Sequence, residues 1–270
     1  MQLRSLRIAL APVLAIAGLA AFALEVPAQQ TQASAQQTQL GALAPANIAK
    51  PRPKPPFDLT GTWRHSGGQG NNFRFSPPPG AKLTPFAQAH LDAAQKAAKE
   101  GKAYHDDIGA CWPAGLPVIM TRVWSIAMVQ APTEIIMVSG FMNSTRFIYL
   151  DGRPHTDPDV VVRSFNGESI GHWENDSLVI DTTNFVNDRH WIDNGIPGTD
   201  ALHIVERVKM TDQGKTLEIE YTLTDPKSWE GDWKMTKRFR RVDDEDITEA
   251  SCLPDLNEHL LSTRPDLNVR

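Results

Sequence analysis

The stretch that decides the fold is LHIVERVKMTDQGKTLEIEYTLT, residues 202–224. In its second half, every second position from Leu217 to Leu223 is apolar, and the positions between them are polar. Successive residues of a strand face opposite sides of a sheet, so this alternation indicates a half-buried strand. Gln213-Gly214 has the character of a hairpin turn. The stretch therefore predicts two paired antiparallel strands, near 201–211 and 215–224.

The same pattern extends outward along the chain in both directions. Further strands are predicted near 59–64, 118–130, 133–139, 144–150, 168–174, 177–184 and 232–242, separated by turn signals such as Asn175-Asp176 and Asp151-Gly152. Eight or nine consecutive strands with short connections predict a mainly β fold, an antiparallel barrel or sandwich. We expect a barrel, because closure removes the exposed edges of a sheet.

One helix is predicted outside this β region, from Pro85 to Glu100. Thr84 provides an N-terminal hydroxyl cap, Pro85 suits the first turn, and Gly101 is a stop signal. Its apolar face is narrow and built of small residues, so we expect the helix to pack on the outside of the barrel.

The N-terminal part of the chain predicts export. Arg4 and Arg7 precede an apolar run that ends in small residues, so residues 1–28 are expected to be a cleaved signal peptide, the alternative being a retained membrane anchor. Residues 29–56 are rich in Gln, Ala and Pro and are expected to form a disordered tether. Residues 57–270 then form a single domain, not embedded in a membrane and either periplasmic or secreted.

Charge and cysteine content narrow the function classes. The chain has 27 basic and 32 acidic residues, a formal net charge of -5 without a dominant basic face, which argues against nucleic acid as a partner. Its two cysteines, Cys111 and Cys252, are expected to form a disulfide in an oxidising compartment. The alternative is two unrelated buried thiols.

Several charged residues share a strand face with apolar ones. Glu206 lies in the apolar row of its strand, and Lys237, Arg122 and Arg146 lie in similar rows of theirs. A buried charge is costly unless it is paired. Glu206 could therefore form a structural ion pair with Lys237 or an inward arginine, or these groups could line a ligand pocket. Both interpretations stay open at this point.

Histidines among the strand ends and loops are candidate acids and bases. His155 and His203 are the candidates of interest, with Asp181 as a carboxylate that could orient them. No zinc-ligand spacing, serine elbow or phosphate loop occurs in the sequence, so we expect neither a metal nor a cofactor. The run His105-Asp106-Asp107 is interpreted as a solvated loop.

Two resemblances add to these expectations. Gly61-Thr62-Trp63 resembles the opening of lipocalin-like barrels, in which a tryptophan closes one end. The segments CWPAGLP (111–117), RFIYLDGRPH (146–155), GHWENDSLVIDT (171–182) and LHIVER (202–207) are similar to a widespread, largely uncharacterised family of exported bacterial proteins. That resemblance implies a β-barrel-like fold and a set of polar site residues, namely Arg146, Asp151, Arg153, His155, Asp181, Glu206 and Arg207.

The first functional hypothesis is a barrel that takes a small, largely apolar molecule into its interior and transforms it by cofactor-free acid/base chemistry, as a lyase, hydratase, isomerase or cyclase does. Glu206 would act as acid or base, with His155 or His203 as its partner and Asp181 in support. The ligand-binding residues would be Arg146, Arg122, Lys237, Trp124 and Tyr149. The alternatives are a non-catalytic carrier of the same ligand class and an interaction module of the cell envelope with an unknown protein partner.

Overall fold

The computed structural model describes residues 39–67, 73–105, 107–250 and 252. The chain divides into two units, Met1–Gln39 and Leu40–Arg270, and the second unit contains all the helices and strands described below. The predicted signal peptide, residues 1–28, lies outside the described residues, as do residues 29–38 of the expected tether.

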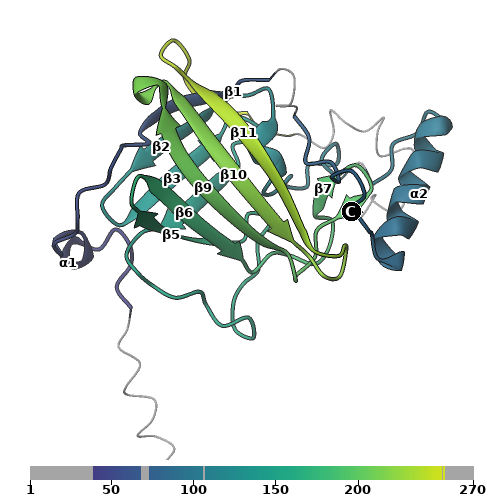
Figure 1. Cartoon of the computed structure of the whole chain (residues 1–270), viewed down its shortest axis with the longest axis horizontal. Helices are drawn as coiled ribbons and strands as arrows, with labels where there is room; N and C mark the ends of the chain where they lie inside the picture. The colour runs from purple at the N-terminus through teal and green to yellow at the C-terminus, as the bar shows by residue number, and fades with distance from the viewer. Residues whose placement is uncertain (1–38, 68–72, 106, 251, 253–270) are drawn as a thin grey trace, which may run out of the picture. The chain divides into compact units, whose positions relative to one another are not determined.

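Nine strands close into a barrel in the order β1-β11-β10-β9-β6-β5-β4-β3-β2. Their bounds are β1 Gly61–His65, β2 Ile126–Gln130, β3 Glu134–Ser139, β4 Thr145–Tyr149, β5 Glu168–Glu174, β6 Ser177–Thr183, β9 His203–Thr211, β10 Thr216–Thr224 and β11 Asp232–Val242. The three long strands β9, β10 and β11 run side by side in the order that the hairpin pattern predicts (Figure 1). The predicted mainly β barrel is confirmed.

One junction of the barrel is parallel. Eight of the nine junctions are antiparallel, whereas β4 and β5 pair in parallel through Ile148 with Ser169 and Tyr149 with Ile170. The number of strands explains this exception. In a closed ring of nine strands, neighbours cannot run in opposite directions at every junction, because nine is odd. At least one neighbouring pair must therefore be parallel. The antiparallel prediction is wrong at this junction alone.

The parallel junction requires a long connection, because parallel neighbours cannot be joined by a tight turn. Residues 150–167 form this connection between β4 and β5. It carries His155 back to strand β6, where the imidazole contacts Asp181. The odd strand number therefore brings a loop histidine against the barrel wall.

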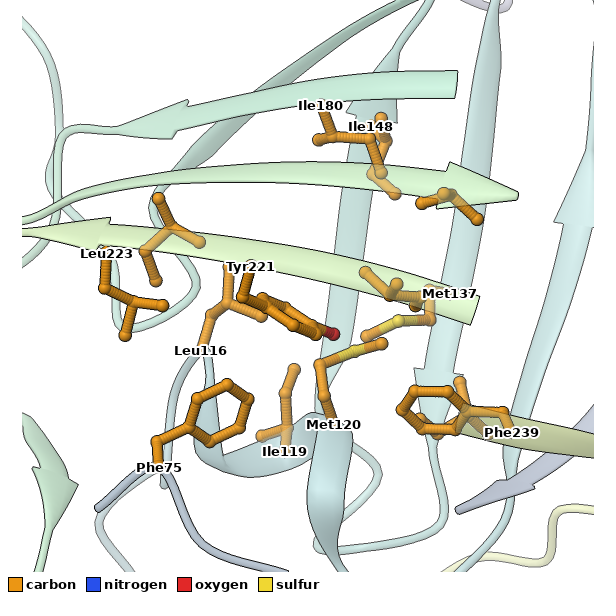
Figure 2. Packing of buried hydrophobic residues seen from close by; sticks show 14 of the residues in the cluster. Phe75, Leu116, Ile119, Met120, Met137, Ile148, Ile180, Tyr221, Leu223 and Phe239 are labelled. Atoms are coloured by element: carbon orange, nitrogen blue, oxygen red, sulfur yellow. The ribbon is translucent and has the colours of Figure 1, made fainter. Parts of the chain in front are cut away.

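The predicted strand 118–130 is wrong in its first part. Val118–Thr121 form a 3₁₀ turn, η2, and the strand β2 begins only at Ile126. Ile119 and Met120 are buried in the core beside Phe75 and Tyr221 (Figure 2). An apolar run of this length is ambiguous between a strand and another buried segment, and here tertiary packing decides for the turn.

The interior of the barrel is filled by side chains. Trp63 on β1 is fully buried, and its indole nitrogen donates to the carbonyl of Leu59 at 2.9 Å. Beside the buried Arg146 and Glu206, the apolar side chains leave a cavity of only about 10 Å³. A void of this size corresponds to one water at most. Within the described residues, side chains therefore fill this part of the interior, where the ligand was expected.

The predicted external helix is confirmed. It is α2, Pro85–Lys99, and the hydroxyl oxygen of Thr84 accepts a hydrogen bond from the backbone N–H of Ala87 at 3.3 Å. The helix packs against a small hairpin outside the barrel, β7 Trp191–Asp193 and β8 Ile196–Pro197. Gly195 in this hairpin has φ +74° and lies so close to Ala94 that a Cβ would stand 2.6 Å from it, so the turn and the docked helix both require glycine there.

Secondary structure begins before residue 57, the expected start of the domain. Residues 45–48 form a short helix, α1 Pro45–Ile48, within the unit that begins at Leu40. The Asn47 side chain is buried and donates to the Asp151 carboxylate at 2.9 Å and to the Gly41 carbonyl at 3.1 Å. Hydrogen bonds of one buried asparagine produce no apolar periodicity in the sequence. The composition of residues 29–56 therefore did not reveal this contact.

The predicted disulfide is confirmed. Cys111 and Cys252 are bonded, with Cα atoms 5.5 Å apart, and the bond closes a sequence separation of 141 residues. Such a bond is compatible with an oxidising compartment. Among the described helices, none is both long and apolar enough to cross a membrane.

Candidate functional site

Arg146 and Glu206 form a buried ion pair inside the barrel. Both side chains are 1% exposed; Arg146 Nη1 donates to Glu206 Oε1 at 3.1 Å, and Nη2 makes a second, short contact with Oε2. The guanidinium also donates to the hydroxyls of Ser169 and Thr182, each at 3.0 Å. Of the partners considered for Glu206, the inward arginine is the one found, so this pair is an internal structural contact.

Glu206 lies apart from the histidines that were expected to assist it. Ile180 and Glu206 are register partners on β6 and β9, and both side chains are buried. Asp181 and His203 therefore project from the opposite, outer face of the same strands. The structure does not bring Glu206 together with His155 or His203, because the barrel wall separates them.

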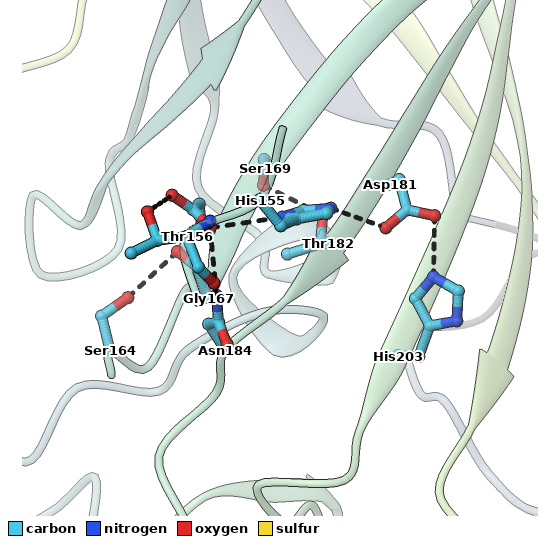
Figure 3. A network of polar contacts seen from close by, with 10 residues as sticks. His155, Thr156, Ser164, Gly167, Ser169, Asp181, Thr182, Asn184 and His203 are labelled. Carbon is cyan, nitrogen blue, oxygen red and sulfur yellow. Dashed lines mark hydrogen bonds and ion pairs between the residues drawn. The ribbon is translucent and has the colours of Figure 1, made fainter. Parts of the chain in front are cut away.

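Four polar residues form a continuous chain on this outer face, which we call the outer polar chain: Glu168, His155, Asp181 and His203. Figure 3 shows His155, Asp181 and His203 of this chain. Asp181 Oδ1 lies 2.8 Å from His155 Nε2, and Asp181 Oδ2 lies 2.8 Å from His203 Nε2. The other nitrogen of His155, Nδ1, lies 3.3 Å from Glu168. One carboxylate thus holds two imidazoles, each of which is partly exposed.

The contacts of this chain favour a charged pair. Burial raises the pKa of the Asp181 carboxyl, but the hydrogen bonds and charges of His203 and His155 outweigh burial and leave the pKa below its ordinary value. The hydrogen bond that His203 donates to Asp181 raises the pKa of His203, against an opposing effect of burial. His203 is therefore protonated at a higher pH than a free imidazole, with Asp181 as its counter-ion.

Arg122 and Trp124 do not face the barrel interior as the predicted strand required. Both lie in the bend between η2 and β2, and Trp124 is 49% exposed. The Arg122 guanidinium lies 4.9 Å from the centroid of the Phe141 ring, and the Trp124 ring packs on the same phenyl group at 4.9 Å.

Lys237 and Tyr149 occupy two other places. Lys237 is buried; its ammonium donates to the backbone carbonyl of Arg74 at 2.7 Å and lies 5.1 Å from the Phe75 ring centroid. Tyr149 is half-buried on the outside of β4, where its ring lies 4.0 Å from the Arg153 guanidinium. It borders an open groove of about 1220 Å³. The nine predicted site residues are thus distributed over several regions.

A pocket of about 400 Å³ lies between α2, the η2 turn and the β7–β8 hairpin. We call it the aromatic pocket, because five rings line it, those of Phe73, Phe75, Tyr104, His105 and Trp191. Four charged residues also line it, namely Arg74, Lys102, Arg122 and Asp193. Its volume is within the range of small-molecule sites, and its lining provides both aromatic surface and charged groups that could fix a ligand.

Buried polar groups fix the rings of this pocket. Trp191 donates its indole N–H to Asp107 Oδ2 at 2.8 Å, and Asp107 is 1% exposed. The Tyr104 hydroxyl is hydrogen-bonded to His90 Nδ1 at 2.7 Å. Burial lowers the pKa of His90, which keeps its imidazole neutral near pH 7. The Trp191 and His105 centroids are 4.9 Å apart, so the wall is pre-formed.

Sequence reasoning missed most of the aromatic pocket. Asp107 was interpreted as part of a solvated loop, but it is buried beneath Trp191. The sequence predicts Arg122 as a ligand-binding residue, but on a strand from 118 to 130 whose first part is the η2 turn in the structure. The density of aromatic residues in segments without strand pattern was the available signal, since loops seldom carry rings without a packing partner or a ligand.

Comparisons with known proteins do not assign a family. The sequence matches no protein-family model, and a search of curated proteins finds no match either. Within the described residues, no group of three or more histidine, cysteine, aspartate or glutamate side chains is arranged to hold a metal ion. The functional argument therefore depends on the geometry of the sites themselves.

Proposed function

We propose that this chain is an exported barrel protein that binds a small, largely apolar molecule in the aromatic pocket. The observation that carries the proposal is a pre-formed hollow of about 400 Å³ lined by five rings, next to a barrel whose own interior is filled. Aromatic side chains provide large apolar contact at little entropic cost. The disulfide supports export, because such bonds persist in oxidising compartments.

A blocked pocket tests this proposal. Ala98 lies on α2 at the pocket wall and is solvent-exposed, so Ala98→Trp adds an indole at the mouth without disturbing the core. Gln95→Trp is the matched control, because Gln95 is exposed on the same helix but does not line the pocket. The probe is N-phenyl-1-naphthylamine, a neutral aromatic fluorophore, in an equilibrium titration.

We expect the wild type and Gln95→Trp to bind this probe with the same affinity. Ala98→Trp should weaken binding by about tenfold or more, equivalent to about 1.4 kcal/mol. Equal binding by all three proteins, or no binding by any of them, contradicts the proposal. Far-ultraviolet circular dichroism of both variants checks that α2 is intact.

Acid/base chemistry at the outer polar chain is a second candidate function. The observation in its favour is that Asp181 holds two partly exposed imidazoles, His155 and His203, each at 2.8 Å. A carboxylate orients an imidazole and stabilises its protonated form, which is the arrangement a general acid needs. Enzymatic conversion of the bound molecule would then require this face rather than Glu206, which is sealed inside the barrel.

Substitution distinguishes a catalyst from a carrier. Asp181→Asn removes the shared carboxylate, and Glu174→Gln is the matched control, since Glu174 accepts hydrogen bonds from His172 and Arg207 on the same outer face. If the chain is an enzyme, mass spectrometry of a small-molecule extract should show conversion beyond one molecule per protein, lost only in Asp181→Asn. Turnover that is unchanged in Asp181→Asn rejects the second candidate.

A further inference from the structure

We infer that the molecule taken by the aromatic pocket is an aromatic monocarboxylate, whose acid group binds the guanidinium of Arg122. This inference rests on the proposed function, because it names the chemical class of the ligand for the same pocket. It depends on one side chain without a partner and on the balance of buried charge around that side chain.

Arg122 is the polar group of the pocket wall that lacks a partner. Within the described part of the chain its guanidinium makes no hydrogen bond and no ion pair, and its Nε atom is buried. Its one assigned contact is the Phe141 ring, 4.9 Å away. A guanidinium carries five N–H donors in a planar fork, and Arg122 is partly buried, which disfavours its charge unless a partner is present. An anion in the pocket would provide that partner.

Asp193 does not supply the missing partner. Its carboxylate already accepts from Arg74 Nη2 at 2.7 Å, Arg74 Nε at 3.2 Å and the Ser76 hydroxyl at 2.7 Å. The charge of Asp193 nonetheless acts on Arg122, where burial lowers the pKa of the guanidinium and Asp193 opposes that effect. Asp193 is thus a distant counter-charge, committed to Arg74.

The local charge balance is positive. Burial also lowers the pKa of Lys237, and Asp193 is again the carboxylate that opposes this effect. Arg122 and Lys237 thus share a single acidic neighbour that is already paired with Arg74. Because Lys237 donates to a backbone carbonyl, the open donor fork at the pocket is that of Arg122. One open guanidinium matches a singly charged, planar acid group, which it can bind through two parallel hydrogen bonds.

Aromatic rings in the lining of the same pocket favour a ring in the ligand. His105 and Trp191 lie 4.9 Å apart and Tyr104 lies 4.5 Å from His105, so these side chains form an aromatic surface. Aromatic rings pack best against other rings in stacked or edge-to-face arrangements. A ring on this surface and an acid group at Arg122 together match the aromatic and the charged parts of the lining of a pocket of about 400 Å³.

Paired probes test the inference. Cinnamate and cinnamamide have nearly the same shape but differ in charge, and isothermal titration calorimetry at pH 7 measures the affinity of each. We expect the wild type to bind cinnamate about 10- to 100-fold more tightly, the range for hydrogen bonds to a charged group. Arg122→Met should abolish this preference, because the charge of the acid group then has no guanidinium to pair with.

Two further variants complete the design. Arg207→Met removes an arginine of the outer face, which pairs with Glu174, and should keep the full preference for cinnamate. Arg122→Lys keeps the charge without the planar fork and should show a smaller preference than the wild type. The comparison within the wild type requires no variant, so it stands even if Arg122→Met fails to fold.

The outcomes separate this inference from the proposed function. Equal binding of cinnamate and cinnamamide by the wild type overturns the inference but leaves a pocket for apolar molecules. A preference for cinnamate that survives in Arg122→Met also overturns it, because the acid group then binds elsewhere. Failure of both probes to bind contradicts the proposed function and the inference together.

Discussion

Removing one partner of the Arg146–Glu206 pair should destabilise the barrel strongly. In Glu206→Gln the guanidinium keeps its charge but loses a bidentate carboxylate partner at a position that is 1% exposed. The hydroxyls of Ser169 and Thr182 remain as neutral acceptors only. Breaking a buried ion pair on one side costs about 3–5 kcal/mol. This is a large part of the roughly 5–15 kcal/mol by which a domain is stable.

The double variant Arg146→Met/Glu206→Leu should recover most of this loss. Both charges are then absent, and the new side chains join an apolar surrounding that includes Ile148, Ile180 and Val208. Ser169 and Thr182 can satisfy one another, because their hydroxyl oxygens are 2.9 Å apart. Buried pairs replaced by apolar groups of similar volume are often neutral or stabilising.

The double-mutant cycle consists of the wild type, the single variants Arg146→Met and Glu206→Leu, and the double variant, and urea denaturation at pH 7 measures the stability of all four. The expected result is a loss of about 3–5 kcal/mol in each single variant and a much smaller loss in the double variant. Single variants that each lose under about 1 kcal/mol, or a double variant as unstable as the sum of the two, would refute the reasoning. The first result would mean that the pair is not desolvated, and the second that it is needed for packing.

Three other perturbations test separate parts of the structure. Burial lowers the pKa of His190 to about 4. The stability that this shift provides is present above about pH 6.5 and is lost as the pH falls towards 4. Urea titrations at pH 7 and pH 4 should therefore show that the free energy of unfolding falls by about 3 kcal/mol, a loss that His190→Gln lacks. The pKa of His203 is raised, so its effect on stability has the opposite pH dependence. The contribution is present below about pH 6.5 and is lost as the pH rises through the pKa of the folded state. The urea midpoint of the wild type should exceed that of His203→Gln at pH 6, and the two midpoints should converge at pH 9. Replacing Cys111 and Cys252 by alanine should lower the free energy of unfolding by about 5 kcal/mol in the chain-entropy model for a separation of 141 residues, and an unchanged denaturation curve would contradict this estimate.

The fold was largely predictable because its strands carry a local signal. The alternation around Gln213-Gly214 predicts β9 and β10, and their register follows from it. The Thr84 cap and Pro85 predict the start of α2 for the same local reason. The parallel junction was not predictable, because it follows from the total number of strands in the ring, which no single segment contains.

The candidate site was predicted only in part, for physical reasons that differ between residues. Strand parity correctly indicated that Glu206 and Arg146 point inward, since the period of two is a local property. Parity could not indicate that His155 reaches Asp181, because a crossover loop brings them together over 26 residues. The aromatic pocket is built from loops, a turn and an external helix, whose mutual positions only tertiary packing determines.

The central claim, that the aromatic pocket takes a small apolar molecule, is tested most directly with the molecules of the native host. Wild type, Ala98→Trp and Gln95→Trp are each incubated with a small-molecule extract, and liquid chromatography with mass spectrometry follows what each protein removes or converts. We predict that at least one species is removed or converted by the wild type and Gln95→Trp but not by Ala98→Trp. The claim would be contradicted if the three proteins left extracts of the same composition, whether all three had removed the same species or none had removed any.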